Sequence, residues 1–297
     1  MWEKVLEHGE TLLGYLEGGL QKGSSNEASE DARKSPIVFL HGVGRAGSDF
    51  LPLFASLADQ RSLYALDARG HGRSGRVPGF YKIRDHARDV LSLLKHLEKP
   101  AVLYGHSMGA LVTIVAAAAR PDLVAGIILE DPPGPDFLAT LKNRPYYKMF
   151  QAMAALAGSS RKVPDLARQI ADIPISRTAS GDTVTLGQVR DAASIRLGAR
   201  YLRDVDPEVY GPLLEAEWLE GVDFTGALQG LSCPVLLMVG EEKAGGMLSE
   251  SEAGVMTAAI PDCLTVPFPG VGHLIHWTAT QGCLATVQSF LIAIDQS

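Results

Sequence analysis

Short apolar runs separated by segments of helical spacing are the feature that most restricts how this chain can fold. Runs of this length, bounded by Gly, Pro or polar residues, are typical of strands that are buried on both faces. Strands that alternate with helices predict the α/β class, with a mostly parallel sheet flanked by helices on both faces. The apolar runs are residues 36–42, 62–67, 100–105, 125–131, 234–240 and 263–270, and the helical segments are residues 49–57, 84–97, 108–119, 249–259 and 278–293.

The beginning of the chain departs from this alternation. Residues 5–8 and 12–16 are predicted to form an antiparallel pair, which brings the expected sheet to eight strands. The segment QKGSSNEASEDARKS, residues 21–35, is mostly polar and shows no apolar pattern of helical or strand period. It is therefore predicted to form a mobile polar loop.

The interval from residue 132 to residue 232 also departs from it, because its patterns are mostly helical and no comparable apolar run occurs there. The whole chain has 297 residues, of which 46% are apolar, enough for one large α/β domain with a subdomain. We therefore expect a core of residues 1–133 and 226–297 and an inserted helical cap, or lid, of residues 134–225.

Charge and hydropathy exclude several classes of partner. The net charge is −7, and no block of Lys or Arg is present, so neither nucleic acid nor an anionic membrane surface is an expected partner. Charges interrupt the apolar residues of the first 19 positions, and no run approaches the ~18 apolar residues of a membrane span. We expect a soluble, cytoplasmic protein.

The three cysteines do not indicate a disulfide framework or a zinc site. Cys233, Cys263 and Cys283 are odd in number, lie late in the chain and lack CxxC spacing. Buried free thiols are the expected state, and no metal is expected.

The segment GHSMG, residues 105–109, lies between an apolar run and an alanine-rich helical pattern. A sharp turn from strand to helix holds its central residue in strained backbone geometry, so the residues on either side must be small. Gly105 and Gly109 meet this requirement, and Ser107 would be displayed at the carboxyl edge of the sheet. In this context the motif predicts a nucleophilic serine, whereas a bare GxSxG match is also compatible with an ordinary tight turn.

A serine nucleophile that attacks a carbonyl needs donors for the developing oxyanion. The strand run 36–42 continues into His41-Gly42-Val43-Gly44, where the glycines allow the backbone to approach a substrate closely. The N–H groups of Val43 and Met108 are the predicted oxyanion hole. Gly42 is a predicted substrate contact, and His41 is predicted to brace the loop.

Taken together, HGVG at 41–44, DARGHGRS at 67–74, GHSMG at 105–109 and PGVGHLIH at 269–276 resemble the α/β-hydrolase superfamily. The order and strand context of these motifs match over nearly the whole chain. The resemblance implies the α/β-hydrolase fold, a chain order of nucleophile, acid and histidine, and no cofactor. It also implies that His71 belongs to a structural loop.

The resemblance points to His273 as the general base, because it follows the last predicted strand and lies among the glycines of PGVGH. His276 is expected to point elsewhere if a helix begins there. His106 flanks the serine and is expected to face away from the open side of its hydroxyl.

The acid is where this sequence departs from the commonest family pattern. That pattern places Gly-x-x-Asp after the seventh strand, but Lys243 stands at the aspartate position. Glu241 or Glu242 could replace the aspartate only with a loop shift. Some branches of the family carry the acid at the end of the sixth strand, 24 residues after the nucleophile, which selects Asp131 over Glu130 in this chain.

The predicted reaction is hydrolysis of a carboxylic ester or lactone of a small, largely apolar substrate through an acyl-enzyme on Ser107. A C–C bond hydrolase, a cofactor-free perhydrolase and a ligand-binding protein without turnover remain alternatives. The expected cap carries apolar and aromatic residues that could contact the substrate or could only pack the cap onto the sheet. They are Tyr146, Phe150, Met153 and Trp218.

Overall fold

The computed structural model describes residues 1–9, 11–19, 34–177 and 182–296. The predicted mobile loop at 21–35 lies almost entirely outside these residues.

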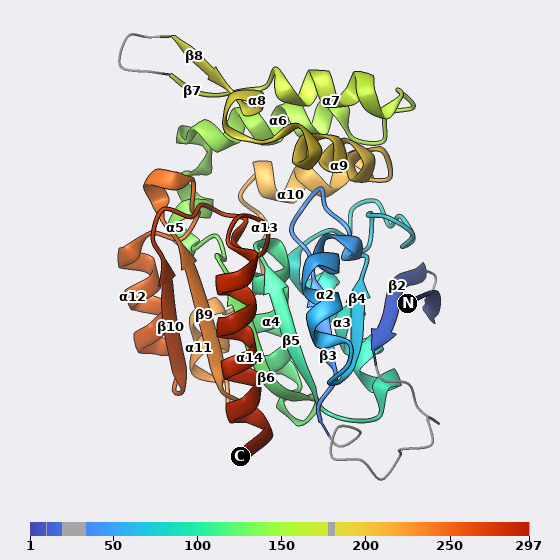
Figure 1. Cartoon of the computed structure of the whole chain (residues 1–297), viewed down its shortest axis with the longest axis vertical. Coiled ribbons are helices and arrows are strands. Elements are labelled where there is room, and N and C mark those ends of the chain that lie inside the picture. The colour runs from blue at the N-terminus through green and yellow to red at the C-terminus, as the bar shows by residue number, and fades with distance from the viewer. Residues whose placement is uncertain (10, 20–33, 178–181, 297) are drawn as a thin grey trace.

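An eight-stranded sheet in the order β1-β2-β4-β3-β5-β6-β9-β10 forms the centre of the molecule (Figure 1). The β1–β2 and β2–β4 pairs are antiparallel, and the remaining pairs are parallel. The predicted fold class and the predicted N-terminal hairpin are therefore confirmed. The strands are β1 (Trp2–His8), β2 (Thr11–Gly19), β3 (Ile37–Leu40), β4 (Ser62–Leu66), β5 (Ala101–His106), β6 (Val124–Glu130), β9 (Val235–Gly240) and β10 (Cys263–Phe268).

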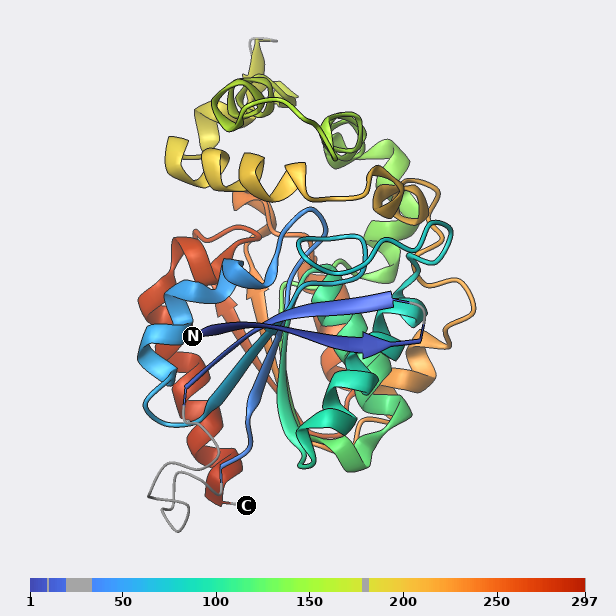
Figure 2. The ribbon, with the colours of Figure 1, turned by 90° about the vertical axis from the view of Figure 1, so that its right-hand side faces the viewer.

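Helices cover both faces of this sheet, as Figure 2 shows along the sheet edge. Two apolar cores follow from this arrangement, one on each face, because successive strand residues point to opposite sides. One face is covered by the short helix η1 (Gly47–Phe50) with α2 (Leu51–Leu57), α13 (Ile275–Thr278) and α14 (Thr280–Gln296). The other face is covered by α3 (Ile83–Leu97), α4 (Met108–Ala119), α11 (Phe224–Gln229) and α12 (Glu250–Ala259).

A second helical layer, residues 145–214, lies above the carboxyl ends of the strands (Figure 1). Short helices α5 (Pro135–Thr140) and η3 (Leu141–Asn143) lead from β6 into it. The interval also holds a feature that the sequence did not indicate: β7 (Pro174–Arg177) and β8 (Thr183–Thr185) form an antiparallel pair of mostly polar residues. The helices of the layer are α6 (Pro145–Leu156), α7 (Val163–Ala171), α8 (Leu186–Val189), α9 (Ala192–Arg203), η4 (Pro207–Tyr210) and α10 (Gly211–Leu214).

Other local expectations were met in part. The helix expected at 278–293 is present as α14, and Ala279 leaves helical geometry between it and the short helix α13. All three cysteines are free, with Cys283 buried and Cys233 and Cys263 half-buried. Within the described ranges, no helix is both long enough and apolar enough to span a bilayer.

Helix α4 lies unusually close to the sheet at its first turn. A Cβ atom on Gly109 would be 2.0 Å from the carbonyl oxygen of Leu40 in β3, and one on Gly105 would be 2.3 Å from the carbonyl oxygen of Gly109. Both obstacles are backbone atoms that cannot rotate away. The two glycines are therefore required by packing as well as by the turn between β5 and α4.

The replacement Gly109→Ala should lower the free energy of unfolding, because overpacking at a backbone contact costs about 1–3 kcal/mol. Gly254→Ala is the matched control: Gly254 lies in α12, and its added Cβ would meet nothing within 4 Å. That variant should be stabilised by about 0.5–1 kcal/mol through helix propensity. Urea denaturation measures both changes, and a Gly109→Ala protein as stable as wild type would contradict the packing argument.

Candidate active site

Ser107 occupies the strained turn that the sequence predicts. Its φ is 55° and its ψ is −117°, between the end of β5 and the first residue of α4. The backbone N–H of Ser107 donates to the carbonyl oxygen of Glu130 at 3.0 Å, which ties the turn to β6. The Ser107 side chain lines a cavity of about 90 Å³ beneath the second helical layer. Strain of this kind persists only where surrounding contacts hold it, and it is concentrated at functional sites.

The loop after β3 and the first residue of α4 supply backbone donors beside this serine. The N–H groups of Val43 and Met108 donate to no group within the described ranges. Gly42 packs against the turn: a Cβ atom there would lie 3.1 Å from the Cβ of Ser107. Gly42, Val43 and Ser107 all line the same cavity.

Two buried histidines hold that loop in place. His41 Nδ1 donates to the carbonyl oxygen of Gly42 at 2.8 Å, and its Nε2 accepts from the N–H of Ala68 at 3.0 Å. His71 Nε2 accepts from the N–H of Gly44 at 3.1 Å. Burial lowers the pKa of His41 to about 4 and that of His71 to about 3, so both rings are neutral and can accept these bonds.

Asp131 and His273 are in direct contact. His273 Nδ1 donates to Asp131 Oδ2 at 2.6 Å, and the carboxylate also accepts from the N–H groups of Gly240 at 3.0 Å and Met247 at 2.8 Å. Asp131 is fully buried and has a positive φ of 42°. Three donors therefore orient this carboxylate, and the bond at Nδ1 leaves Nε2 of His273 available for another partner.

His273 and Ser107 line the same cavity but share no hydrogen bond in this structure. A catalytic serine–histidine contact is often long before substrate binds. The His106 ring packs against the His273 ring with centroids 4.6 Å apart, and His106 Nε2 donates to the backbone oxygen of His273 at 3.0 Å. His106 thus holds the His273 loop through its backbone.

None of the alternative acids contacts His273. Glu241 Oε2 accepts from the N–H of Gly270 at 2.6 Å, and Glu242 lies 3.8 Å from Arg144 at the surface. Glu130 is fully buried and bonds instead with His276 and Tyr104. Of the four carboxylates considered in the sequence, only Asp131 is placed against the histidine.

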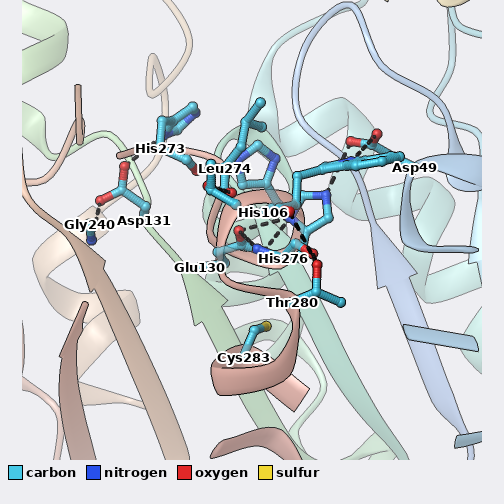
Figure 3. A network of polar contacts seen from close by, with 12 residues as sticks. Asp49, His106, Glu130, Asp131, Gly240, His273, Leu274, His276, Thr280 and Cys283 are labelled. Carbon is cyan, nitrogen blue, oxygen red and sulfur yellow. Dashed lines mark hydrogen bonds and ion pairs between the residues drawn. The ribbon is translucent and has the colours of Figure 1, made fainter. Parts of the chain in front are cut away.

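Glu130 and His276 form a buried charge network beside the site (Figure 3). His276 Nδ1 lies 2.8 Å from both carboxylate oxygens of Glu130, and His276 Nε2 lies 3.4 Å from Asp49 Oδ2. Arg45 in turn forms an ion pair with Asp49. Two anionic and two cationic groups balance one another here.

This network changes the titration of its members. Burial alone would lower the pKa of His276, but the charges of Glu130 and Asp49 and their hydrogen bonds outweigh it and raise the pKa to about 9. Burial alone would raise the pKa of Glu130, but the neighbouring histidines lower it to about 2. The pair is therefore ionised at neutral pH.

The cavity next to Ser107 opens beside a larger one, of about 740 Å³, which also contains His273. Phe150 and Met153 line the smaller cavity, whereas Tyr146 lines the larger one and donates to the carbonyl oxygen of Gly245 at 2.9 Å. The expectation for Trp218 is wrong: its side chain is 2% exposed, packs in the apolar core and lines neither cavity.

Sequence reasoning missed four polar residues of the smaller cavity. Arg45 lines it from the loop after β3, and Arg190, Ser194 and Tyr210 line it from the second helical layer. None of the three from that layer belongs to a motif, and only the packing of the layer over the sheet brings them to Ser107. Among the residues that the structure describes, no group of three His, Cys, Asp or Glu side chains could hold a metal ion.

A model of the alpha/beta hydrolase family matches residues 37–286. The chain belongs to the α/β-hydrolase family. Of the curated relatives, 2-(acetamidomethylene)succinate hydrolase of Mesorhizobium japonicum is 27% identical over 267 residues, which cover 86% of this chain and 88% of that protein. The 3-oxoadipate enol-lactonase 2 of Acinetobacter baylyi is 28% identical over 213 residues, with 71% and 72% covered. The crystal structure of E-2-(acetamidomethylene)succinate hydrolase superposes on this hydrolase with a TM-score of 0.74 at 23% identity and covers 98% of each chain.

The buried network of this hydrolase predicts a pH dependence of stability. The folded pKa of His276 is above the ordinary value of 6.5, so protonation of His276 favours the folded state. This contribution is complete below about pH 6.5 and is lost as the pH rises through about 9. We expect the difference in unfolding free energy between wild type and His276→Asn to be about 3–5 kcal/mol at low pH, as for a broken buried ion pair, and to shrink towards alkaline pH.

Urea denaturation at several values between pH 6 and pH 10 measures this difference. His96→Asn, at an exposed position of α3, is the matched control and should follow the wild-type curve. A difference for His276→Asn that stays constant across the range would show that the ring is not held in its charged form.

Proposed function

We propose that this protein is a serine hydrolase that cleaves a carboxylic ester or lactone through an acyl-enzyme on Ser107. In this mechanism His273 Nε2 accepts the Ser107 proton while the serine oxygen attacks the carbonyl carbon of the substrate. Asp131 stabilises the imidazolium that forms. The N–H groups of Val43 and Met108 donate to the carbonyl oxygen as it becomes negative, a contribution worth about 10²–10³ in rate per donor.

Breakdown of this tetrahedral intermediate releases the alcohol, which takes its proton from His273. Water then attacks the acyl-enzyme with His273 again as base, and the carboxylic acid leaves as Ser107 regains its proton. All of these steps use residues of this chain, and none requires a metal or an organic cofactor.

The observation that carries the proposal is a serine in a strained turn that shares one cavity with a histidine already oriented by a buried aspartate. A serine that only formed a turn would need neither unoccupied backbone donors nor an oriented base nearby. The relationship to hydrolases supports the reaction type, and the lactonase relative supports lactones among the substrates.

The second helical layer acts in this proposal as the cap over the reacting atoms. Its walls are largely apolar, with Met149, Phe150, Ile195 and Leu202 facing the cavity. Apolar walls exclude water from the charged intermediates and favour a substrate with an apolar body.

The test is hydrolysis of p-nitrophenyl esters and lactones by wild type and variants. Ser107→Ala should reduce kcat by about 10⁶, and Asp131→Asn by about 10⁴, because the histidine then loses its orienting anion. Glu250→Gln, at an exposed carboxylate in the first turn of α12, is the matched control and should keep wild-type activity. Circular dichroism and urea denaturation establish that each variant is folded.

Retained turnover in folded Ser107→Ala would refute the acyl-enzyme, and retained turnover in Asp131→Asn would refute the role of Asp131. If wild type cleaves no ester or lactone, a panel of C–C bond substrates, a peroxide-dependent halogenation assay and a ligand-binding assay separate the remaining alternatives.

A further inference from the structure

Among the residues that the structure describes, Arg190 has no hydrogen-bond or ion-pair partner for its side chain, and it lies in the wall of the candidate active site. It lies between α8 and α9, and it lines both the cavity of Ser107 and the larger cavity beside it. Its backbone N–H donates to the carbonyl oxygen of Leu186. Its guanidinium forms no hydrogen bond and no ion pair with any residue that the structure describes.

The carboxylates around Arg190 are already engaged with other groups. Asp191 follows it in sequence but accepts from the N–H of Ser194 at 2.8 Å, as the cap of α9. Asp49 binds Arg45, and Asp131 binds His273. Glu242, in the wall of the larger cavity, lies 3.8 Å from Arg144 at the surface.

The environment of Arg190 makes this isolation unfavourable. Burial and the nearby charge of Arg45 together lower the pKa of Arg190 to about 10, so the group is still cationic at neutral pH. Arg190 is half-buried, and a cation that is partly removed from water without a counter-ion destabilises the folded protein. An anion in the cavity would relieve that penalty and the repulsion between the two arginines.

We propose that Arg190 binds a carboxylate of the substrate while the scissile carbonyl lies at Ser107. The substrate class is then an ester or lactone that has an apolar body and carries one free carboxylate. This inference rests on the proposed function for the reacting bond, but the anion site itself depends only on Arg190.

A carboxylate suits the site in geometry and in size. The planar guanidinium can donate two parallel hydrogen bonds to a carboxylate. Hydrogen bonds between charged groups of this kind are stronger than hydrogen bonds between neutral groups. The remaining cavity walls are largely apolar, so one end of the substrate would contact Met149, Phe150 and Leu202 and the other would meet the arginine. The net charge of the chain is −7, so long-range electrostatic attraction would not favour an anionic substrate. A preference for an anionic substrate would therefore have to come from groups in the cavity itself.

The experiment compares matched substrates that differ only in charge: mono-p-nitrophenyl adipate and suberate, and the same compounds with the free acid methylated. Wild type should prefer a free acid in kcat/KM by about 10- to 100-fold at the better chain length, as expected for a charge-assisted pair. Arg190→Gln should remove the preference by slowing only the free acids. Arg190→Lys should keep part of it, and the control Arg200→Gln, at an exposed position of α9, should keep all of it.

The thermal midpoint separates a ligand-binding arginine from a structural one. Because Arg190 has no partner to leave unpaired, Arg190→Gln should be at least as stable as wild type. A marked fall in its midpoint, or an unchanged preference for the free acid, would overturn the proposal.

Binding of adipate to Ser107→Ala, measured by calorimetry, tests the anion site without turnover. Adipate should bind this variant, and the double variant with Arg190→Gln should bind it about 10- to 100-fold more weakly. If wild type hydrolyses none of the esters but this difference in binding appears, the proposed reaction fails and the anion site stands. If the esters are hydrolysed but adipate binding does not depend on Arg190, the anion site fails and the reaction stands.

Discussion

Two consecutive buried carboxylates at the end of β6 hold the rest of the site in position. Glu130 is the last residue of the strand and Asp131 the first after it, and each binds a histidine from the segment that follows β10. Figure 3 shows the two side chains pointing to different sides, that of Asp131 towards His273 and that of Glu130 towards His276. The two carboxylates thus fix His273 above the sheet edge and His276 within the core.

Each of the two pairs is stabilised in a different way. The Glu130–His276 pair is fully buried and belongs to a balanced set of charges with Asp49 and Arg45, so its loss would leave charges without partners. In the Asp131–His273 pair the histidine lines the cavity, and the buried carboxylate behind it is oriented by backbone N–H groups. One pair thus anchors the loop, while the other leaves Nε2 of His273 without a partner among the residues that the structure describes.

Much of the fold could be read from the sequence, because buried parallel strands leave continuous apolar runs and the turn at Ser107 needs small neighbours. The register of 24 residues, taken from the family, pointed to Asp131, and the structure brings that carboxylate to His273. The β7–β8 pair carried no signal because its residues are mostly polar. Trp218 was wrongly predicted to contact the substrate. An aromatic residue in an inserted segment can pack in the apolar core or line a cavity, and the sequence does not distinguish the two. Arg190 could not be found, since the absence of a counter-ion is a property of three-dimensional packing alone.

The most direct test of the central account is covalent labelling of the wild-type protein with a fluorophosphonate probe, followed by peptide mass spectrometry. The account predicts one modified residue, Ser107, and labelling that is much slower in folded Asp131→Asn, because the oriented histidine activates the serine. Modification of a different residue, or labelling of Ser107 that does not depend on Asp131, would contradict it.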